Sequence, residues 1–176
     1  MAQPPVIETE RLRLVPFVAR HLTERYVSWL NDPKVVRYSD QRHHQHTLAS
    51  CQRYWRSFDG APSYFWAIEA RTATLDHIGN LTAMIDPPNG VAWAHMLIGA
   101  TEVWNQGLGT EAWRAACDHL LVKEGFRKIK AGTYENNDGM LTIMRKTGMS
   151  IDGRLAREIV FDGEEIDLIF ASRYRN

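Results

Sequence analysis

The sequence has few of the features that mark disulfide-stabilised or metal-stabilised proteins. It contains only two cysteines among its 176 residues, Cys51 and Cys117. Each lies among apolar neighbours in a stretch with helical spacing, so we expect buried free thiols rather than a disulfide. The tract 42–46 (RHHQH) is rich in histidine, but its spacing matches no common zinc pattern, so we expect no metal site there.

The chain also lacks an excess of one charge and any long apolar run. Lys plus Arg and Asp plus Glu both number 21, which gives a formal net charge of zero. A neutral chain lacks the positive field typical of proteins that bind nucleic acid or anionic membranes. No apolar run approaches the roughly 20 residues that span a bilayer, and the first residues (MAQPP) lack the features of a signal peptide. We therefore expect a cytoplasmic protein that binds neither nucleic acid nor membrane.

The length and composition are those of an ordinary globular domain. Hydrophobic residues make up 44% of the chain and charged residues 24%, and a chain of this size can bury a sizeable core. We expect residues 1–176 to form a single domain. Apolar alternation and turn signals predict strands over residues 11–17, 64–70, 77–85, 91–98, 128–134, 157–161 and 164–171. Helical spacing predicts helices over residues 22–30, 47–58, 107–124 and 137–146, and this order indicates an α/β or α+β fold with a mixed sheet.

Several residues mark the ends of these elements. Thr47 is expected as the N-cap of the second helix, with Asn137 or Asp138 in the same role for the fourth. Gly125 should end the third helix in a left-handed conformation. The dipeptide Asp162-Gly163 predicts a two-residue hairpin turn, because both of its positions require positive φ.

The most informative segment runs from Leu97 to Ala112 (LIGATEVWNQGLGTEA), where a strand leads through a loop directly into a helix. Gly107 and Gly109 let the backbone approach an anion without a Cβ in the way. The first N–H groups of a helix lack intrahelical partners and its dipole favours negative charge, so the segment is typical of a pyrophosphate cradle. The Gly-x-Gly tripeptide alone is more typical of an ordinary strand-to-helix turn. The segment lacks the Gly-Lys-Ser/Thr of a Walker loop, and Ala112 replaces the third glycine of a dinucleotide fingerprint.

With its flanking residues, this segment resembles the acetyl-CoA loop of the GNAT N-acetyltransferase superfamily, in the branch of the ribosomal-protein alanine acetyltransferases. The resemblance covers nearly the whole chain in the right order. The matching segments are residues 8–14 (ETERLRL), 104–112 (WNQGLGTEA), Asn137, 146–149 (KTGM), 153–157 (GRLAR) and Asp167.

The resemblance implies a GNAT fold, a mixed and mostly antiparallel twisted sheet with helices on both faces. Its fourth and fifth predicted strands would splay apart to admit the pantetheine arm of acetyl-CoA, the co-substrate. Met96, Leu97 and Ile98 would meet the pantetheine, Asn137 would contact it from the facing helix, and an N–H at or near Leu97 would polarise the thioester carbonyl. The pyrophosphate would be held by the N–H groups of Gln106, Gly107, Leu108, Gly109 and Thr110.

Three positions depart from the family pattern. Trp104 stands where the loop usually begins with Arg or Gln. Met140 and Met144 replace the Ser or Tyr that serves many relatives as general acid. A thiolate with an intrinsic pKa near ~8.5 is a tolerable leaving group, so an assigned acid is not essential.

The acceptor amine needs a base because an alkylammonium is protonated at pH 7. His95 is the first candidate, since it lies two residues before the expected oxyanion contact and titrates near neutrality; a structural imidazole is the alternative. Glu69, His77 and Asp86 are further candidates on neighbouring strands.

The expected reaction is direct attack of a primary amine on the bound thioester, since neither cysteine lies beside the site. A neutral chain and an expected aromatic wall favour a free or nucleotide-linked aminosugar, a small-molecule acceptor, with a protein N-terminus or a drug-like amine as alternatives. That wall is Tyr38, Tyr64, Trp66 and Trp93. Arg37 or Arg42 could pair with a phosphate and Tyr38 could stack on a sugar or base. A silent CoA-binding module is the alternative from another class, and a homodimer is compatible with the sequence.

Overall fold

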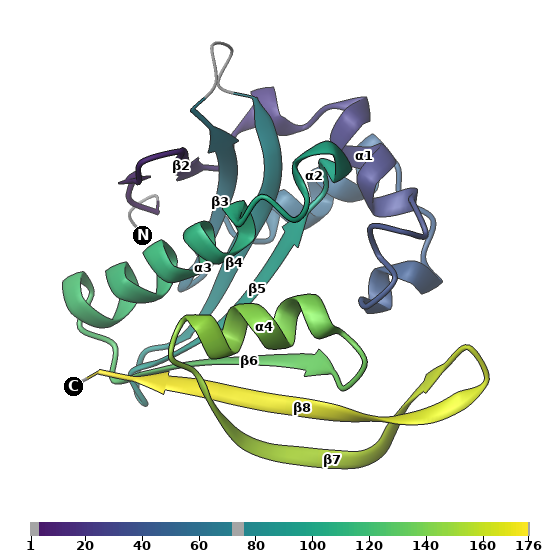
Figure 1. The fold of residues 1–176 in the computed structure, drawn as a ribbon. Coiled ribbons are helices and arrows are strands. Elements are labelled where there is room, and N and C mark those ends of the chain that lie inside the picture. Colours follow the sequence, from purple (N-terminus) through teal and green to yellow (C-terminus); the bar gives the residue numbers. More distant parts are fainter. Residues whose placement is uncertain (1–3, 72–75, 176) are drawn as a thin grey trace.

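The computed structural model describes residues 4–71 and 76–175. Eight strands form one sheet in the order β1-β2-β3-β4-β5-β6-β8-β7 (Figure 1). Every neighbouring pair is antiparallel except β5 and β6, which are parallel. The strands are β1 (Ile7–Glu8), β2 (Leu12–Pro16), β3 (Ser63–Ala70), β4 (His77–Asp86), β5 (Val91–Ile98), β6 (Lys128–Tyr134), β7 (Ser150–Phe161) and β8 (Glu164–Tyr174). The mixed sheet expected from the sequence is confirmed.

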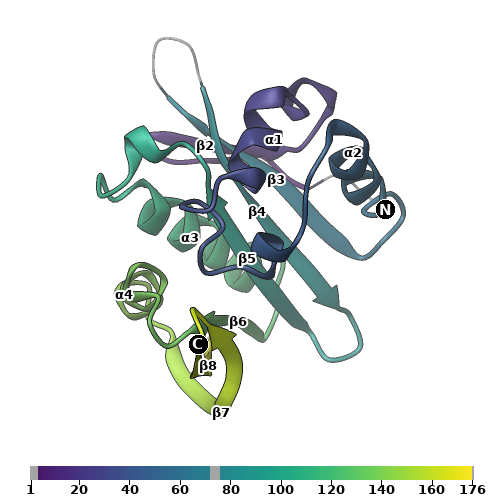
Figure 2. The ribbon, with the colours of Figure 1, turned by 90° about the vertical axis from the view of Figure 1, so that its right-hand side faces the viewer.

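Helices cover both faces of the sheet (Figure 2). The helices are α1 (Glu24–Asn31), α2 (Leu48–Arg56), α3 (Leu108–Asp118) and α4 (Asp138–Lys146). Short 3-10 turns lie at Ala19–His21, Asp40–His43 and Thr101–Val103. α3 and α4 lie on one side and α1 and α2 on the other, so each face of the central strands is packed against helices.

The expected ends of these elements are largely confirmed. Thr47 caps α2, its side chain accepting a hydrogen bond from the Ser50 N–H. The Asn137 side chain likewise accepts from the Met140 N–H at the start of α4. Asp162 and Gly163 adopt φ values of 52° and 87° in the turn between β7 and β8. The Thr47 and Asn137 side chains thus pair with N–H groups that have no partner within the first turn of a helix.

The third helix differs from the prediction for residues 107–124. The α-helix ends at Asp118, and the chain continues as a π-helical turn over His119–Lys123 before Gly125 ends it with a φ of +78°. The buried side chains of Leu120 and Leu121 keep this turn packed on the core. A π turn changes the phase of the helix without breaking its apolar face, so the sequence pattern gives no sign of it.

The core is apolar and contains both thiols. Cys51 and Cys117 are buried and free, as expected. Burial raises the pKa of the Cys117 thiol to about 12, so it stays protonated and unreactive at neutral pH. Leu48, in the first turn of α2, is 37% exposed.

The described helices include none with the length and apolar character needed to cross a membrane.

Gly99 allows α1 to dock on the end of β5. A Cβ built at Gly99 would lie 2.1 Å from a ring carbon of Trp29, whose indole is buried against this point. The close approach holds α1 over the place where β5 leaves the sheet and enters the loop before α3.

We therefore predict that Gly99→Ala destabilises the protein by roughly 1–3 kcal/mol, the usual range for overpacking a filled core. Gly153→Ala is the matched control, because its Cβ would meet nothing within 4 Å. Thermal denaturation of both variants measures the difference. Equal melting temperatures would show that Trp29 is free to move aside.

Candidate functional site

The sheet opens between β5 and β6. Within the described residues the two strands pair only from Val91 to Trp93 with Lys128 to Lys130. Beyond this point they diverge, as Figure 1 shows. A cavity of about 700 Å³ lies at the opening, lined by the end of β5, the start of α3, the start of α4, and Tyr38 with Ser39 from the loop after α1.

The register of β4 and β5 decides which backbone groups face this opening. The N–H of Gly99 donates to the carbonyl of Ile78 at 3.0 Å. Hydrogen-bonded pairs alternate along antiparallel strands, so Leu97 is again hydrogen-bonded with its partner Asn80. The backbone groups of Met96 and Ile98 therefore face the opening, where β6 no longer pairs with them.

The start of α3 forms a bare backbone cradle beside the opening. Gly107 occupies the N-cap position with a φ of +79°, a left-handed conformation that favours glycine. The first N–H groups of α3 lack intrahelical partners, and the helix dipole adds positive potential there. A Cβ at Gly109 would meet the side chains of Ile143, Met96 and Ile98 at 3.3–3.6 Å, so this glycine lets the helix approach the strand.

The indole of Trp104 ties the loop to β5. Its Nε1–H donates to the carbonyl of Ile98 at 2.9 Å, and the Lys34 ammonium lies 5.3 Å from the ring centroid. The residue that departs from the family pattern thus has a structural role. Lys34, which also lines the cavity, was missed because nothing in the sequence links the loop after α1 to this site.

A polar clamp joins the N-terminal segment to this cradle. The Arg11 guanidinium donates to the Glu111 carboxylate at 2.7 Å and to the Gln106 carbonyl at 2.9 Å. The Thr9 hydroxyl donates to the same carboxylate at 2.6 Å. Partial burial alone would raise the pKa of Glu111, but the hydrogen bonds from Thr9 and Arg11 and the charge of Arg11 lower it. Segments 8–14 and 104–112 both match the family pattern and lie far apart in the sequence. In the structure they are in direct contact.

Asn137 lines the cavity, but its side chain is already engaged. Its oxygen accepts from the Met140 N–H at 3.2 Å, and its nitrogen donates to the Thr133 hydroxyl at 3.0 Å. Met140 lines the cavity beside it. Met144 is buried beneath α4. A thioether has no proton to donate, so neither methionine serves as the general acid.

His95 lies on the opposite face of β5 from Met96 and Ile98, because side chains alternate along a strand. Its register partner is Thr82, which pairs in turn with Phe65. Phe65 packs on Tyr54 of α2 and on Phe58 just after it, so His95 lies on the α2 face of the sheet. The ring stacks on Trp93 at 5.9 Å, and desolvation by its neighbours lowers its pKa although the residue keeps access to solvent.

The other three candidates for the base are occupied within the fold. Burial would raise the pKa of Glu69, but hydrogen bonds from His21 and Arg20 lower it. Burial lowers the pKa of His77 to about 4, in a cluster of aromatic rings. Asp86 accepts a hydrogen bond from the Asn89 amide in the turn after β4.

The prediction that Tyr38, Tyr64, Trp66 and Trp93 form one aromatic wall is wrong. Trp66 is fully buried, and Tyr64 contacts it and donates to Glu124 at the end of the π turn, so both lie on the α3 side. Trp93 lies on the α2 side. The sequence pattern identified strand residues correctly, but their alternation places them on different faces.

The loop between α1 and α2 packs against the β7–β8 hairpin. Tyr38 stacks on Phe161, with ring centroids 5.6 Å apart. Arg42 donates to the Tyr134 hydroxyl and to the Val160 carbonyl. Among the described residues no group of three or more metal-ligating side chains is found, in the 42–46 tract or elsewhere. Arg42 and Tyr38 thus have intramolecular partners in the positions where a phosphate or a base was expected.

Comparison with known proteins identifies the family. The model of the acetyltransferase (GNAT) domain matches residues 11–150. No curated protein sequence matches the chain. Several solved structures share its fold.

A GNAT-family acetyltransferase from Bacillus anthracis is 17% identical, with a TM-score of 0.82 over 97% of this chain and 99% of that one. RimL, a ribosomal L7/L12 alpha-N-protein acetyltransferase solved with coenzyme A, is 14% identical, with a TM-score of 0.83 over 97% and 98%. Spermidine N-acetyltransferase from Vibrio cholerae, solved with CoA and spermine, is 16% identical, with a TM-score of 0.82 over 95% and 97%. The family match covers most of the chain, and the protein therefore belongs to the GNAT acetyltransferases, enzymes that transfer an acetyl group from acetyl-CoA to an amine.

Proposed function

We propose that this acetyltransferase binds acetyl-CoA from the α3–α4 side of the opening and acetylates an aminosugar, free or nucleotide-linked, that enters from the α2 side. The two-sided opening between β5 and β6 is the observation that carries the proposal. One side presents a backbone cradle for an anion. The other presents a neutral imidazole next to an aromatic ring.

On the coenzyme side, the N–H groups of residues 106–110 would hold the pyrophosphate. The backbone of Met96 and Ile98 would hydrogen-bond the pantetheine like an added strand. Since the Leu97 N–H is directed toward Asn80 by the register, the oxyanion contact near Leu97 is assigned to the N–H of Met96 or Ile98. Asn137 would shape this channel as the cap of α4, with its side chain fixed by two hydrogen bonds.

On the acceptor side, His95 would take the proton that the ammonium must lose. The free amine then attacks the thioester carbonyl carbon, so that a C–N bond forms and the C–S bond breaks. The coenzyme leaves as a thiolate, which is protonated by solvent, and the acetylated nitrogen loses its second proton. A pKa below the ordinary histidine value keeps His95 neutral, and hence basic, at pH 7.

Two alternatives are set by specific observations. RimL is described as acting on a ribosomal protein N-terminus, so a peptide N-terminus is the second candidate acceptor. The Vibrio cholerae enzyme is described as a spermidine acetyltransferase. Met140 and Met144 at the general-acid positions motivate a non-catalytic CoA-binding module. Release of free thiol from acetyl-CoA in the presence of amines excludes that module.

Gly109→Asp and Gly107→Asp should abolish acetyl-CoA binding, because each adds a side chain and a negative charge to the expected pyrophosphate cradle. The test is the rise in melting temperature that acetyl-CoA gives by binding only the folded state. Gly153→Asp, in open space on β7, is the control and should keep the rise. Unchanged rises in both loop variants would place the pyrophosphate elsewhere.

His95→Ala should lower kcat by about 100-fold with nearly unchanged acetyl-CoA affinity, if His95 is the base. In the parent enzyme, kcat/KM should fall as the pH drops through a pKa below 6.5, because protonation removes the base. The variant should lose this step in the pH profile. If His95→Ala keeps the parental rate from about pH 5 to about pH 8, His95 is not the base, and another group or a water molecule takes that role.

For the acceptor, we predict that a nucleoside-diphosphate aminosugar has a kcat/KM at least ~10-fold above that of a peptide N-terminus, equivalent to ~1.4 kcal/mol in transition-state binding. Steady-state assays with both amines at one acetyl-CoA concentration decide this. If the peptide is the better substrate, the aminosugar proposal fails and N-terminal acetylation replaces it.

A further inference from the structure

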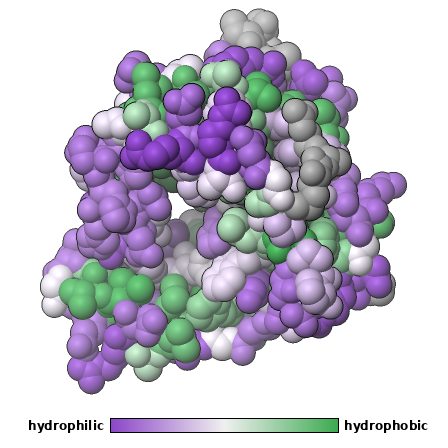
Figure 3. Space-filling model, turned by 180° about the vertical axis from the view of Figure 1, so that it is seen from behind, coloured by the Kyte–Doolittle hydropathy of each residue, from purple (hydrophilic) through white to green (hydrophobic). Residues whose placement is uncertain are grey.

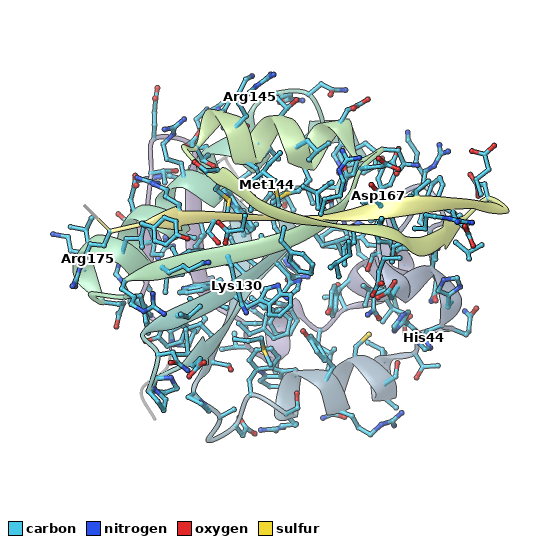
Figure 4. The ribbon with its side chains drawn as sticks, turned by 90° about the horizontal axis from the view of Figure 1, so that it is seen from below. His44, Lys130, Met144, Arg145, Asp167 and Arg175 are labelled. Carbon is cyan, nitrogen blue, oxygen red and sulfur yellow. The ribbon has the colours of Figure 1, made fainter. Side chains whose placement is uncertain are left out.

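A second cavity lies on the acceptor face of the sheet, next to the place where β5 and β6 still pair. It has a volume of about 430 Å³ and is lined by the end of β4, the start of β5, the turn between them and the start of β6. Trp93 and Lys130 line it from paired positions on β5 and β6, so their side chains share one face. Figure 4 shows Lys130 on the side of the sheet that faces α2, with Met144 on the α4 side. Seen from behind, the molecular surface has a deep hollow beside the loop between α1 and α2, on the side of the first opening and not of the β4–β5 turn (Figure 3).

The charges lining this cavity are mainly positive. Arg127, Lys128 and Lys130 face a single acid, Asp86, which accepts from Asn89. Lys128 is paired with Asp152. Within residues 4–71 and 76–175, Lys130 and Arg127 form no ion pair with a carboxylate. Arg127 donates to a backbone carbonyl through Nε, which leaves the rest of its guanidinium available. The lining therefore carries a net positive charge, and a concave positive site raises the local concentration of anions.

Trp93 forms part of the wall of the same cavity. Its indole N–H is buried and has no hydrogen-bond partner among the described residues. The Lys130 ammonium lies 4.3 Å from the centroid of the indole ring, and the His95 ring stacks on the indole with centroids 5.9 Å apart.

The contacts of Trp93 also connect the cavity to His95. Lys130 and His95 both contact the Trp93 ring, so a chain of contacts leads from the cavity to the proposed base. Leu97, at the opening, lies four residues beyond Trp93, or about 13 Å along a strand at ~3.3 Å per residue. A single amino acid or a free sugar is too short to fill the cavity and present its amine at the opening. A longer acceptor with a negative group at its far end fits both.

We infer that the cavity of Trp93, Arg127 and Lys130 binds the phosphoryl groups of a nucleotide-linked acceptor and positions its amine at His95. This inference rests on the proposed function and narrows the acceptor to an anionic, extended amine. Polyamines are disfavoured, because their ammonium groups would meet Lys130 and Arg127.

A binding titration tests the cavity independently of turnover. Uridine diphosphate is titrated by calorimetry into the full-length protein already saturated with coenzyme A, which occupies the other nucleotide-binding region. We expect saturable binding that Lys130→Met weakens at least 10-fold, since methionine keeps the apolar stem over Trp93 but removes the charge. Arg127→Met should weaken it likewise. Lys123→Met, at an exposed position on the π turn, is the matched control.

The melting temperature of each variant establishes that it is folded. Absence of saturable binding by the parent, or equal weakening in Lys123→Met, overturns the inference. So does unchanged binding in both Lys130→Met and Arg127→Met.

A second arm separates this inference from the proposed function. The ratio of kcat/KM for UDP-glucosamine over glucosamine should fall at least 10-fold in Lys130→Met, through a higher KM for the nucleotide-linked amine. If neither amine is acetylated while a peptide is, the proposed aminosugar function fails. In that case the diphosphate titration still decides whether the cavity binds anions.

Discussion

The pairing of β5 with β6 stops after three residues, and the chemistry of the whole molecule depends on that stop. A sheet that continued to pair would bury the backbone groups of Met96 and Ile98 in its ladder. Because the strands diverge, these groups remain available at an opening with helices on both sides. The parallel direction of the pair matters too, since both strands enter the opening at their carboxyl ends, directly before the loops that lead into α3 and α4.

The elements around the opening are held by contacts between distant parts of the chain. The Thr9–Arg11–Glu111 clamp fixes the loop before α3 from the N-terminal segment, and Trp104 ties the same loop to the end of β5. Gly99 lets Trp29 of α1 press on that strand end from the other side. The backbone cradle is thus held in place by side-chain contacts within the protein, a pre-organisation that reduces the entropy lost on binding.

Much of the fold could be predicted from the sequence because its signals are local. Helix caps such as Thr47 and Asn137, and the Asp162-Gly163 turn, depend on hydrogen bonds and φ values within a few residues. The face of the sheet on which each strand residue lies could not be predicted in the same way. Trp66 and Trp93 look alike in sequence, but the register places them on opposite faces. The partnership of Arg42 with Tyr134 and the basic cavity around Lys130 depend on long-range packing that carries no local pattern.

Amide hydrogen exchange at three consecutive residues tests the central claim, that the opening between β5 and β6 receives the pantetheine arm. The Met96 and Ile98 N–H groups face the opening, whereas the Leu97 N–H is paired with β4. NMR-detected exchange should therefore slow at Met96 and Ile98 when acetyl-CoA is added and change little at Leu97. Saturating acetyl-CoA that leaves the exchange of Met96 and Ile98 unchanged, while protecting amides elsewhere, would contradict the account.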